Sequence, residues 1–415
     1  MKQKMTKRFG CLFLAVSVSL IFFAVLFPGT VIAGPAFSGI TANADSAETV
    51  VNNPAGMTRL KQPSVYGNPM IFYSRSKSES TVKNTGYQKT SGDELLGAAP
   101  GLYYAQPLGD RWAVGIGPNS AMGLGASFDD DWAGRYLMQN WSLVFAGIAP
   151  SAAYRINDQF SIGASLPIMY SQYTLEKAVS NIEPGSADGS FALTGDGWGM
   201  GVNIGMLYEF TERTRFGLTY RSKVSMTVEG KPELSGLTAD RLQLLDKFGV
   251  LNQDISIDTG TPQAVNAGMF HEFGNGWSCS LDGAWVDFSS WGLEEVTIGE
   301  TAITTKPGHY NDIWAVTLGV GYALTPQWNL RSGAFYVTSP MDEEYRTAGM
   351  RLDRMWGVGL GFEYAYRKGR SVSFDVTYIQ FGEGRFTAHD VPNTGDIQGE
   401  YTTNYGLAFG LGTKW

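Results

Sequence analysis

The sequence predicts an all-β protein, an antiparallel transmembrane β-barrel of about 14 strands. Three observations lead to this prediction. Long segments alternate residue by residue between large apolar side chains and small or polar ones, aromatic side chains gather near the segment ends, and short connections alternate with long ones. After residue 33 no apolar run approaches the ~20 residues that a membrane helix needs. Strands, and not helices, therefore carry the apolar surface.

The first 33 residues predict a secretory signal peptide, cleaved after Ala33. Basic residues and no acidic ones precede an apolar run from Cys11 to Phe27, and Val31-Ile32-Ala33 supplies small residues for cleavage. A retained membrane anchor is the alternative. Cleavage would make the chain more acidic than its whole net charge of −8, which argues against nucleic acid as a partner. Cys279 would then be the only cysteine, so no disulfide framework is expected.

The clearest alternating segment covers residues 198–210. Its even positions are large and apolar, and its odd positions are mostly glycine or polar. The same pattern returns in five further segments: 216–229, 314–322, 356–366, 372–378 and 404–415. Weaker segments complete the series: 64–73, 100–107, 112–118, 143–155, 160–174, 262–273, 277–288 and 329–337. An even number of strands is what a single-chain bacterial barrel needs.

The two faces of these strands favour a membrane barrel over a soluble β-sandwich. In a sandwich the apolar face points inward and rarely stays regular for ten residues. In a barrel the apolar face meets lipid, and the inner face is free to be small or polar. Glycine opposite bulky residues, as in 198–210, also suits a lumen that has to contain something else.

The connections alternate strictly between tight and long. Turn-forming residues make six tight joins: 108–111, 156–159, 211–214, 274–276, 325–327 and 368–369. Seven longer joins lie near 74–99, 119–142, 175–197, 230–261, 289–313, 338–353 and 379–403. Short periplasmic turns and long external loops are typical of such barrels, so we expect both termini on the periplasmic side. The leucine spacing from Leu237 to Phe248 predicts a short helix in one loop.

The last residue, Trp415, is in the outward register of the final strand. A terminal aromatic residue on a last amphipathic strand is similar to the signal that the outer-membrane assembly machinery recognises. An ordinary surface tryptophan is the alternative. The expected location is the outer membrane of a bacterial cell.

Several stretches together resemble the FadL family of outer-membrane transporters of hydrophobic compounds. Asn53-Pro54-Ala55 resembles part of that family's N-terminal hatch. Alone, this motif is weak evidence. The further matches follow in the same order along the chain: 34–39, 44–45, 131–136, 197–199, 207–209, 218–222, 228–230, 285, 289–291, 328–333 and 353–356.

This resemblance implies how the chain is divided. Residues 1–33 would be the signal peptide, 34–62 a hatch folded into the lumen, and 63–415 the transmembrane barrel. Family hatches extend about a dozen residues further upstream, where this chain has its signal peptide. Either the hatch is shorter here, or cleavage occurs earlier than Ala33.

The resemblance also implies the activity and its residues. Long-chain fatty acids would be taken up by diffusion and released sideways into outer-membrane lipid, with Asn53, Pro54 and Ala55 at the lateral gate. Ligand contacts are expected at an external groove and in the inner pocket: Phe37, Trp132, Tyr136, Trp141 and Phe145. For Trp141 and Phe145 an interfacial aromatic girdle is the alternative. A monomer without cofactor or metal is expected.

Other functions remain open at this point. A monoaromatic hydrocarbon channel fits as well, because no basic residue is assigned to a carboxylate. A general porin would use inward Arg221, Lys223 and Glu229 as charged rings. An enzyme is poorly supported, since no metal-ligand spacing, phosphate loop or Ser–His pairing is evident.

Overall fold

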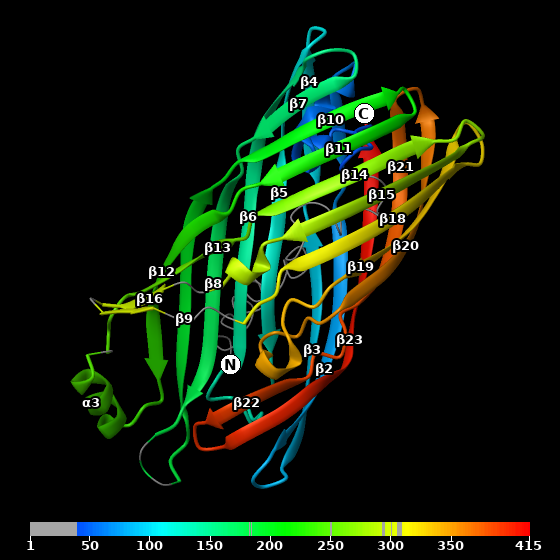
Figure 1. Cartoon of the computed structure of the whole chain (residues 1–415). Helices are drawn as coiled ribbons and strands as arrows, with labels where there is room; N and C mark the ends of the chain where they lie inside the picture. Colours follow the sequence, from blue (N-terminus) through cyan, green and yellow to red (C-terminus); the bar gives the residue numbers. More distant parts are fainter. Residues whose placement is uncertain are drawn as a thin grey trace, which may run out of the picture.

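The computed structural model describes residues 40–181, 183, 185–249, 251–292, 295–299, 301–304 and 309–415. The predicted signal peptide and Phe37 lie outside the described residues. The chain forms a closed antiparallel barrel of 14 spans, several of which are divided into two consecutive strands (Figure 1). Among the described residues, no helix is both long and apolar enough to cross a bilayer.

The spans follow one another around the barrel in chain order. They are β1 (Ser64–Gly67) with β2 (Met70–Val82), β3 (Gln88–Ala99) with β4 (Leu102–Leu108), β5 (Trp112–Ser127), β6 (Asn140–Arg155), β7 (Phe160–Ser165) with β8 (Ile168–Val179), β9 (Gly189–Met200) with β10 (Asn203–Thr211), β11 (Thr214–Arg221) with β12 (Val224–Ser235), β13 (Ile255–Thr261) with β14 (Ala264–Glu272), β15 (Trp277–Val286), β18 (Ile313–Ala323), β19 (Trp328–Val337), β20 (Met355–Arg367), β21 (Arg370–Gln380) and β23 (Gly395–Lys414).

The first and last spans close the barrel. On one side Tyr73 of β2 is opposite Leu96 of β3, and on the other side it is opposite Leu407 of β23. Closure leaves few strand edges, which is how a sheet satisfies its backbone inside a bilayer.

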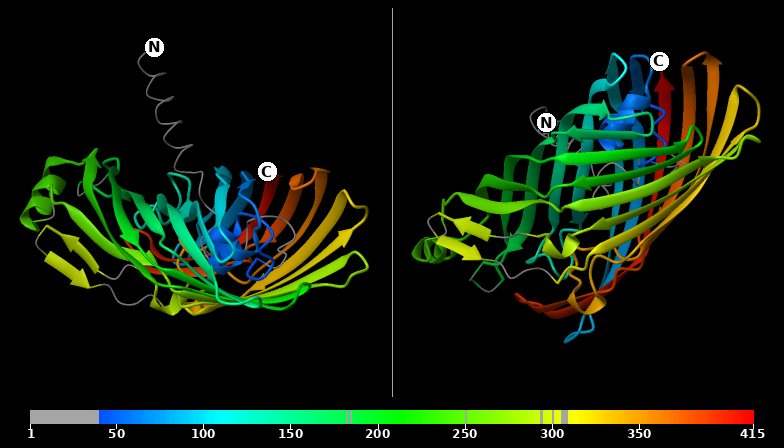
Figure 2. Two further views of the ribbon diagram at one scale, coloured as in Figure 1. Left: turned by 90° about the horizontal axis from the view of Figure 1, so that it is seen from above. Right: turned by 45° about the horizontal axis from the view of Figure 1, so that its top comes forward.

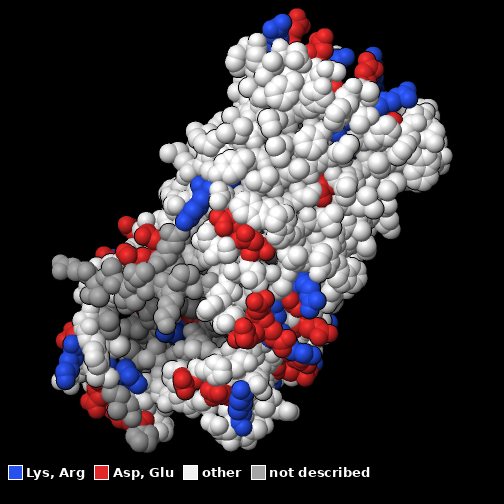
Figure 3. Space-filling view, viewed as in Figure 1, with Lys and Arg blue, Asp and Glu red and all other residues white. Residues whose placement is uncertain are grey.

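The outer surface carries the apolar face that the alternation predicts. Leu96, Trp198, Met200 and Leu360 are each more than 60% exposed. On the face that Figure 3 shows, charged side chains gather at the upper rim and over the lower half, and few lie in the band between these two regions. An apolar band between two charged rims matches the hydrocarbon core of a membrane. The structure thus confirms the barrel, and with it the inverted face pattern.

The six predicted tight turns are confirmed, and they lie at the same end as the C-terminus (Figure 1). Five of the seven longer joins are shorter than expected, and those near 289–313 and 338–353 keep about their predicted length. In the region 74–99, strands β2 and β3 leave only residues 83–87 as a turn. These strands extend past the apolar band with polar side chains on both faces. The predicted loops began where the alternation ended, so they included the polar ends of the strands. The predicted loop helix is present as α3 (Ala239–Lys247).

The remaining short elements belong to the external joins. They are β16 (Glu295–Ile298), β17 (Thr301–Thr304), β22 (Phe386–Val391), η3 (Phe288–Ser290) and η4 (Glu343–Tyr345).

One predicted face is wrong. Lys223 and Glu229 are exposed, while Val224, Met226 and Val228 are buried. The alternation shifts by one position because β11 ends at Arg221 and β12 begins at Val224. Three apolar side chains therefore face the lumen where charged ones were expected, which counts against a charged pore.

Residues 40–60, called the luminal segment below, lie inside the ring of strands (Figure 2). The segment contains α2 (Thr49–Asn52) and the 3-10 helix η2 (Pro54–Arg59). Most of its residues are buried, although helices this short have little stability of their own. Contacts with the barrel wall therefore hold it in place.

Candidate functional site

The luminal segment is organised around Asn53-Pro54-Ala55. The Asn53 side chain accepts a hydrogen bond from the Ala55 N–H at 3.2 Å and so caps η2, while Pro54 occupies the first turn, where no N–H is needed. The Asn53 Nδ2 donates to the Thr41 carbonyl at 2.8 Å and to the Met206 carbonyl at 2.9 Å. One side chain thus fixes the turn and ties it to β10.

The wall behind this motif is made of glycine. Gly163 of β7 is opposite Gly205 of β10, and Gly217 lies on the next strand, β11. A Cβ on Gly205 would lie 2.2 Å from the Asn53 Oδ1, and one on Gly217 would lie 2.1 Å from the Thr41 carbonyl oxygen. Only a wall without side chains lets the segment come this close. The alternation in 198–210 predicted such a wall without identifying its occupant.

Charged residues tie the segment to the periplasmic end of the barrel. Arg59 pairs with Glu209 of β10. Arg215 of β11 is almost fully buried, pairs with Asp45 at 3.3 Å and lies over the Phe270 ring, 4.4 Å from its centroid. No pattern in the sequence pointed to these pairs, because the partners are far apart in the chain.

Glu48 lies at the start of α2 and faces a buried ion pair of the wall. Arg331 of β19 and Asp375 of β21 form that pair at 3.2 Å. The Glu48 Oε1 is buried without a hydrogen-bond partner. Burial raises the pKa of Glu48 to about 7, against the attraction of Arg331 and with the repulsion of Asp375. The protonated form therefore suits this position best.

We expect the luminal segment to be held less firmly as the pH rises from 5 to 8. A carboxyl with a raised pKa favours the docked state below its ordinary pKa, and that contribution is lost as the pH passes through about 7. Glu48→Gln keeps a neutral side chain at every pH and should remove the dependence. Hydrogen exchange of residues 40–60, corrected for the intrinsic effect of pH, measures it. The same pH dependence in both proteins would contradict this role.

Beyond the segment, toward the external end, the lumen is apolar. One buried cluster combines aromatic, aliphatic and methionine side chains from most of the spans and from the external joins. Its bulkier members are Phe72, Leu143, Phe145, Met169, Leu193, Met226, Phe288, Phe335, Met341, Met350, Met355 and Phe381. Methionine is flexible and polarizable, so this surface suits apolar ligands of varied shape.

A seam in the barrel wall lies beside this cluster. β5 pairs with β4 from Trp112 to Ile116, but no pairing joins β3 to the rest of β5 within the described residues. The β5–β6 register shifts between Asn119 and Met122, which marks a bulge that bends the strand. Near the external end the wall closes again, where the Asp129 N–H donates to the Ser91 Oγ at 2.7 Å. Leu95 of β3, a cluster member, is next to the seam.

The predicted external contacts fall into two groups. Trp132 is buried in the 119–142 join, stacks on Phe128 with centroids 4.0 Å apart and donates to the Met138 carbonyl. The Tyr136 hydroxyl bonds the Asp188 carboxylate at 2.9 Å. Both side chains thus have structural partners, and their ligand role stays a prediction.

Trp141 and Phe145 belong to the inside of the barrel. Phe145 is 2% exposed and is a member of the apolar cluster. Trp141 packs against both this cluster and the loop cluster around Trp132. The girdle alternative for these residues is wrong, because a girdle residue faces lipid.

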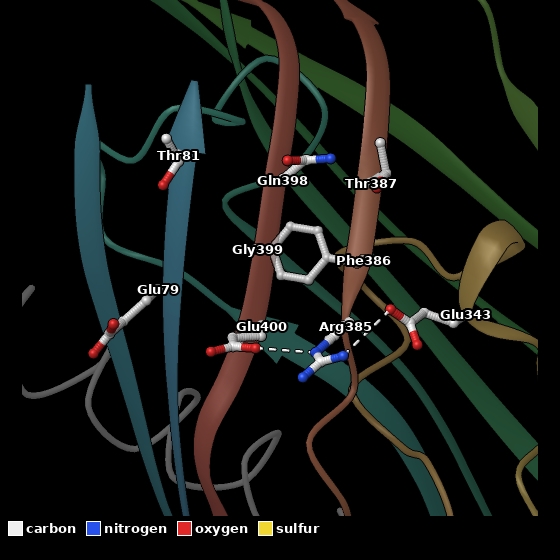
Figure 4. Close-up of a pocket in the computed structure, with 9 residues that line it drawn as sticks. All are labelled: Glu79, Thr81, Glu343, Arg385, Phe386, Thr387, Gln398, Gly399 and Glu400. Atoms are coloured by element: carbon white, nitrogen blue, oxygen red, sulfur yellow. Dashed lines mark hydrogen bonds and ion pairs between the residues drawn. The ribbon is translucent and has the colours of Figure 1, made fainter. Parts of the chain in front are cut away.

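A separate cavity of about 460 Å³ lies at the external end, between β2, β22, β23 and η4. Figure 4 shows Arg385 between Glu400 and Glu343, with nitrogen–oxygen distances of 3.2 and 3.9 Å. Its charged lining does not suit an apolar ligand. No group of His, Cys, Asp and Glu in the described part of the chain is arranged to hold a metal ion.

Trp415 continues the last strand, β23. Its N–H donates to the Val65 carbonyl at 3.0 Å, and its side chain is 48% exposed. This placement fits the outward register, while its part in assembly stays a prediction.

A family model and curated relatives both match most of this chain. The family model described as "Outer membrane protein transport protein (OMPP1/FadL/TodX)" matches residues 29–414. A long-chain fatty acid transport protein of Escherichia coli O6:H1 is 24% identical, with 91% of this chain and 92% of the relative covered.

Two solved structures share the fold. A Pseudomonas aeruginosa FadL homologue superposes with a TM-score of 0.79 at 18% identity, covering 92% of this chain and 97% of the other. The Pseudomonas putida toluene transporter TodX gives a TM-score of 0.66 at 16% identity, covering 89% and 94%. Together with the apolar outer band, the family match places the barrel in the bacterial outer membrane. The chain belongs to the OMPP1/FadL/TodX family of outer-membrane transport proteins.

Proposed function

We propose that this protein is a diffusion channel that takes up long-chain fatty acids and releases them sideways into the outer membrane. The observation that carries the proposal is the apolar luminal cluster beside the unpaired seam between β3 and β5. An apolar chain gains roughly 0.8 kcal/mol for each CH₂ removed from water. Transfer of the fatty acid from the cluster into the membrane interior is therefore more favourable than its transfer into the aqueous periplasm.

The curated relatives support fatty acids as the substrate. The E. coli relative is named a long-chain fatty acid transport protein. TodX, whose fold is shared, is named a toluene transporter, so monoaromatic hydrocarbons are the second candidate. The cluster draws side chains from most of the spans, so its apolar surface is extended, which suits a long acyl chain better than a single aromatic ring.

The luminal segment would act as the hatch, the part of residues 34–62 that blocks a straight path to the periplasm. Asn53, Pro54 and Ala55 would form its edge at the lateral gate. The protein would work as a monomer and would catalyse no reaction. Residues 1–33 would be removed as a signal peptide, and Trp415 would guide barrel assembly.

Uptake by cells lacking their own fatty acid transporter tests the proposal. We expect the full chain to increase uptake of labelled oleate, and deletion of residues 34–50 to change it at equal surface amounts. Liposomes containing the purified protein should not swell rapidly in sugars. Fast sugar flux without oleate uptake would favour a general porin, and binding of toluene but not oleate would favour the aromatic alternative.

A further inference from the structure

Three polar residues form a row on neighbouring strands, just beyond the luminal segment. Ser165 of β7 is opposite Asn203 of β10, and Asn203 is opposite Arg221 of β11. All three side chains are at least nine-tenths buried. They face the lumen, because the Asn203 Nδ2 and the Arg221 Nη2 both donate to the Val51 carbonyl of the segment, at 3.1 and 3.3 Å.

Arg221 has only part of its hydrogen bonding satisfied. Its Nε and Nη1 are buried without an acceptor. The Ser165 Oγ lacks a partner as well, and so do the Oδ1 atoms of Asn52 and Asn203. A buried cation with unpaired N–H groups is costly unless a group that can accept them occupies the site.

Most other arginines that reach the lumen contrast with Arg221. Five are paired with a carboxylate: Arg59 with Glu209, Arg215 with Asp45, Arg331 with Asp375, Arg346 with Asp353 and Arg351 with Asp93. Arg155 donates to the Thr58 carbonyl and leaves only its Nε without an acceptor, whereas Arg221 leaves two nitrogens. Within the described residues, no ion pair joins Arg221 to an acidic side chain. Its positive charge is therefore left for a ligand.

The apolar cluster begins directly next to this row. The same span continues beyond Arg221 with Val224, Met226 and Val228, which are members of the cluster. Met169 on β8 belongs to the same cluster. A long apolar chain lying on these side chains would have its end at Arg221. The site thus joins an apolar surface to one unpaired cation, which is the chemistry of an ionised fatty acid.

We propose that Arg221, assisted by the Ser165 hydroxyl, binds the carboxylate of a fatty acid whose chain lies against the apolar cluster. This inference rests on the proposed function and sharpens it, because it selects an anionic amphiphile over a neutral hydrocarbon. The unpaired Oδ1 atoms of Asn52 and Asn203 leave acceptors for water beside the carboxylate. Arg221 acts here as a specificity-determining residue.

Binding of oleate and of oleyl alcohol to the purified protein at neutral pH tests the site, because the two probes differ only in the head group. We expect the wild-type protein to prefer oleate. Arg221→Met should weaken oleate binding ~10- to 100-fold and leave the alcohol nearly unchanged, as a charge-assisted hydrogen bond predicts. Arg221→Lys should restore part of the preference.

The double variant Arg331→Met/Asp375→Asn is the matched control, because it removes a buried luminal arginine together with its partner. It should keep the preference for oleate. Equal loss of both probes in Arg221→Met would overturn the carboxylate site. If that variant does not fold, the wild-type comparison still decides, since equal binding of acid and alcohol contradicts the inference. Binding of neither probe by the wild-type protein would instead overturn the proposed function.

Discussion

Gly217→Val is expected to displace the luminal segment and so open a pore through the barrel. The first side-chain carbon would lie 2.1 Å from the Thr41 carbonyl oxygen and 2.7 Å from its carbon, and both are backbone atoms. Backbone hydrogen bonds join most neighbouring strands of the barrel, whereas the luminal segment contains only short helices, which have little stability of their own. The segment should therefore yield first. Single-channel conductance in planar bilayers should rise severalfold, and residues 40–60 should become open to proteases.

A second glycine of the wall tests the docking of the same luminal segment. A Cβ on Gly163 would lie 2.5 Å from the Ala55 nitrogen, so Gly163→Val should act in the same direction. Gly283→Val is the control, because this exposed strand glycine has no atom closer than 4.0 Å to its would-be Cβ. Unchanged conductance and a protected segment in Gly217→Val would show that the glycine wall does not position the segment.

Deleting Ala121 should abolish fatty acid uptake while ligand binding persists. Between Asn119 and Met122, β5 advances one residue more than β6, and such an extra residue bends a strand. The bulge lies in the part of β5 that has no pairing with β3 within the described residues. A single deletion restores a regular register and lets β5 pair with β3, which closes the seam. Uptake of labelled oleate at equal surface amounts should fall to the level of cells without the protein.

The control for this deletion removes Thr85 from the turn between β2 and β3, which shortens the chain away from the seam. It should leave uptake unchanged. Normal uptake by the Ala121 deletion, with the β5–β6 register confirmed to be regular, would exclude the seam as the exit and would direct attention to the periplasmic opening.

The strand pattern was readable from the sequence because side-chain alternation is local. The outward face of 198–210 is confirmed by Trp198 and Met200, which are 66% exposed. The prediction failed where a local break changed the phase, between Arg221 and Val224. A two-residue interruption leaves no clear signal in composition, yet it exchanges the two faces of the rest of that span.

The candidate site could be predicted from the sequence only in part. Asn53-Pro54-Ala55 was recognisable as a rigid turn and by its resemblance to a hatch motif. Its three contacts on the wall, Gly163, Gly205 and Gly217, come from three strands, so no spacing in the sequence connects them. Arg221 was noticed only as a possible pore residue, because its lack of an acidic partner is a property of the assembled lumen.

The sequence by itself determined the kind of molecule: an exported, acidic chain whose period-two segments require a lipid-facing barrel with short turns on the periplasmic side. It did so because strand formation and lipid exposure depend on neighbouring residues. The tertiary structure decided what the barrel contains. The docking of the luminal segment, the seam between β3 and β5 and the unpaired Arg221 all depend on groups brought together by closing the sheet. Such long-range contacts follow from register and closure, which no single segment encodes.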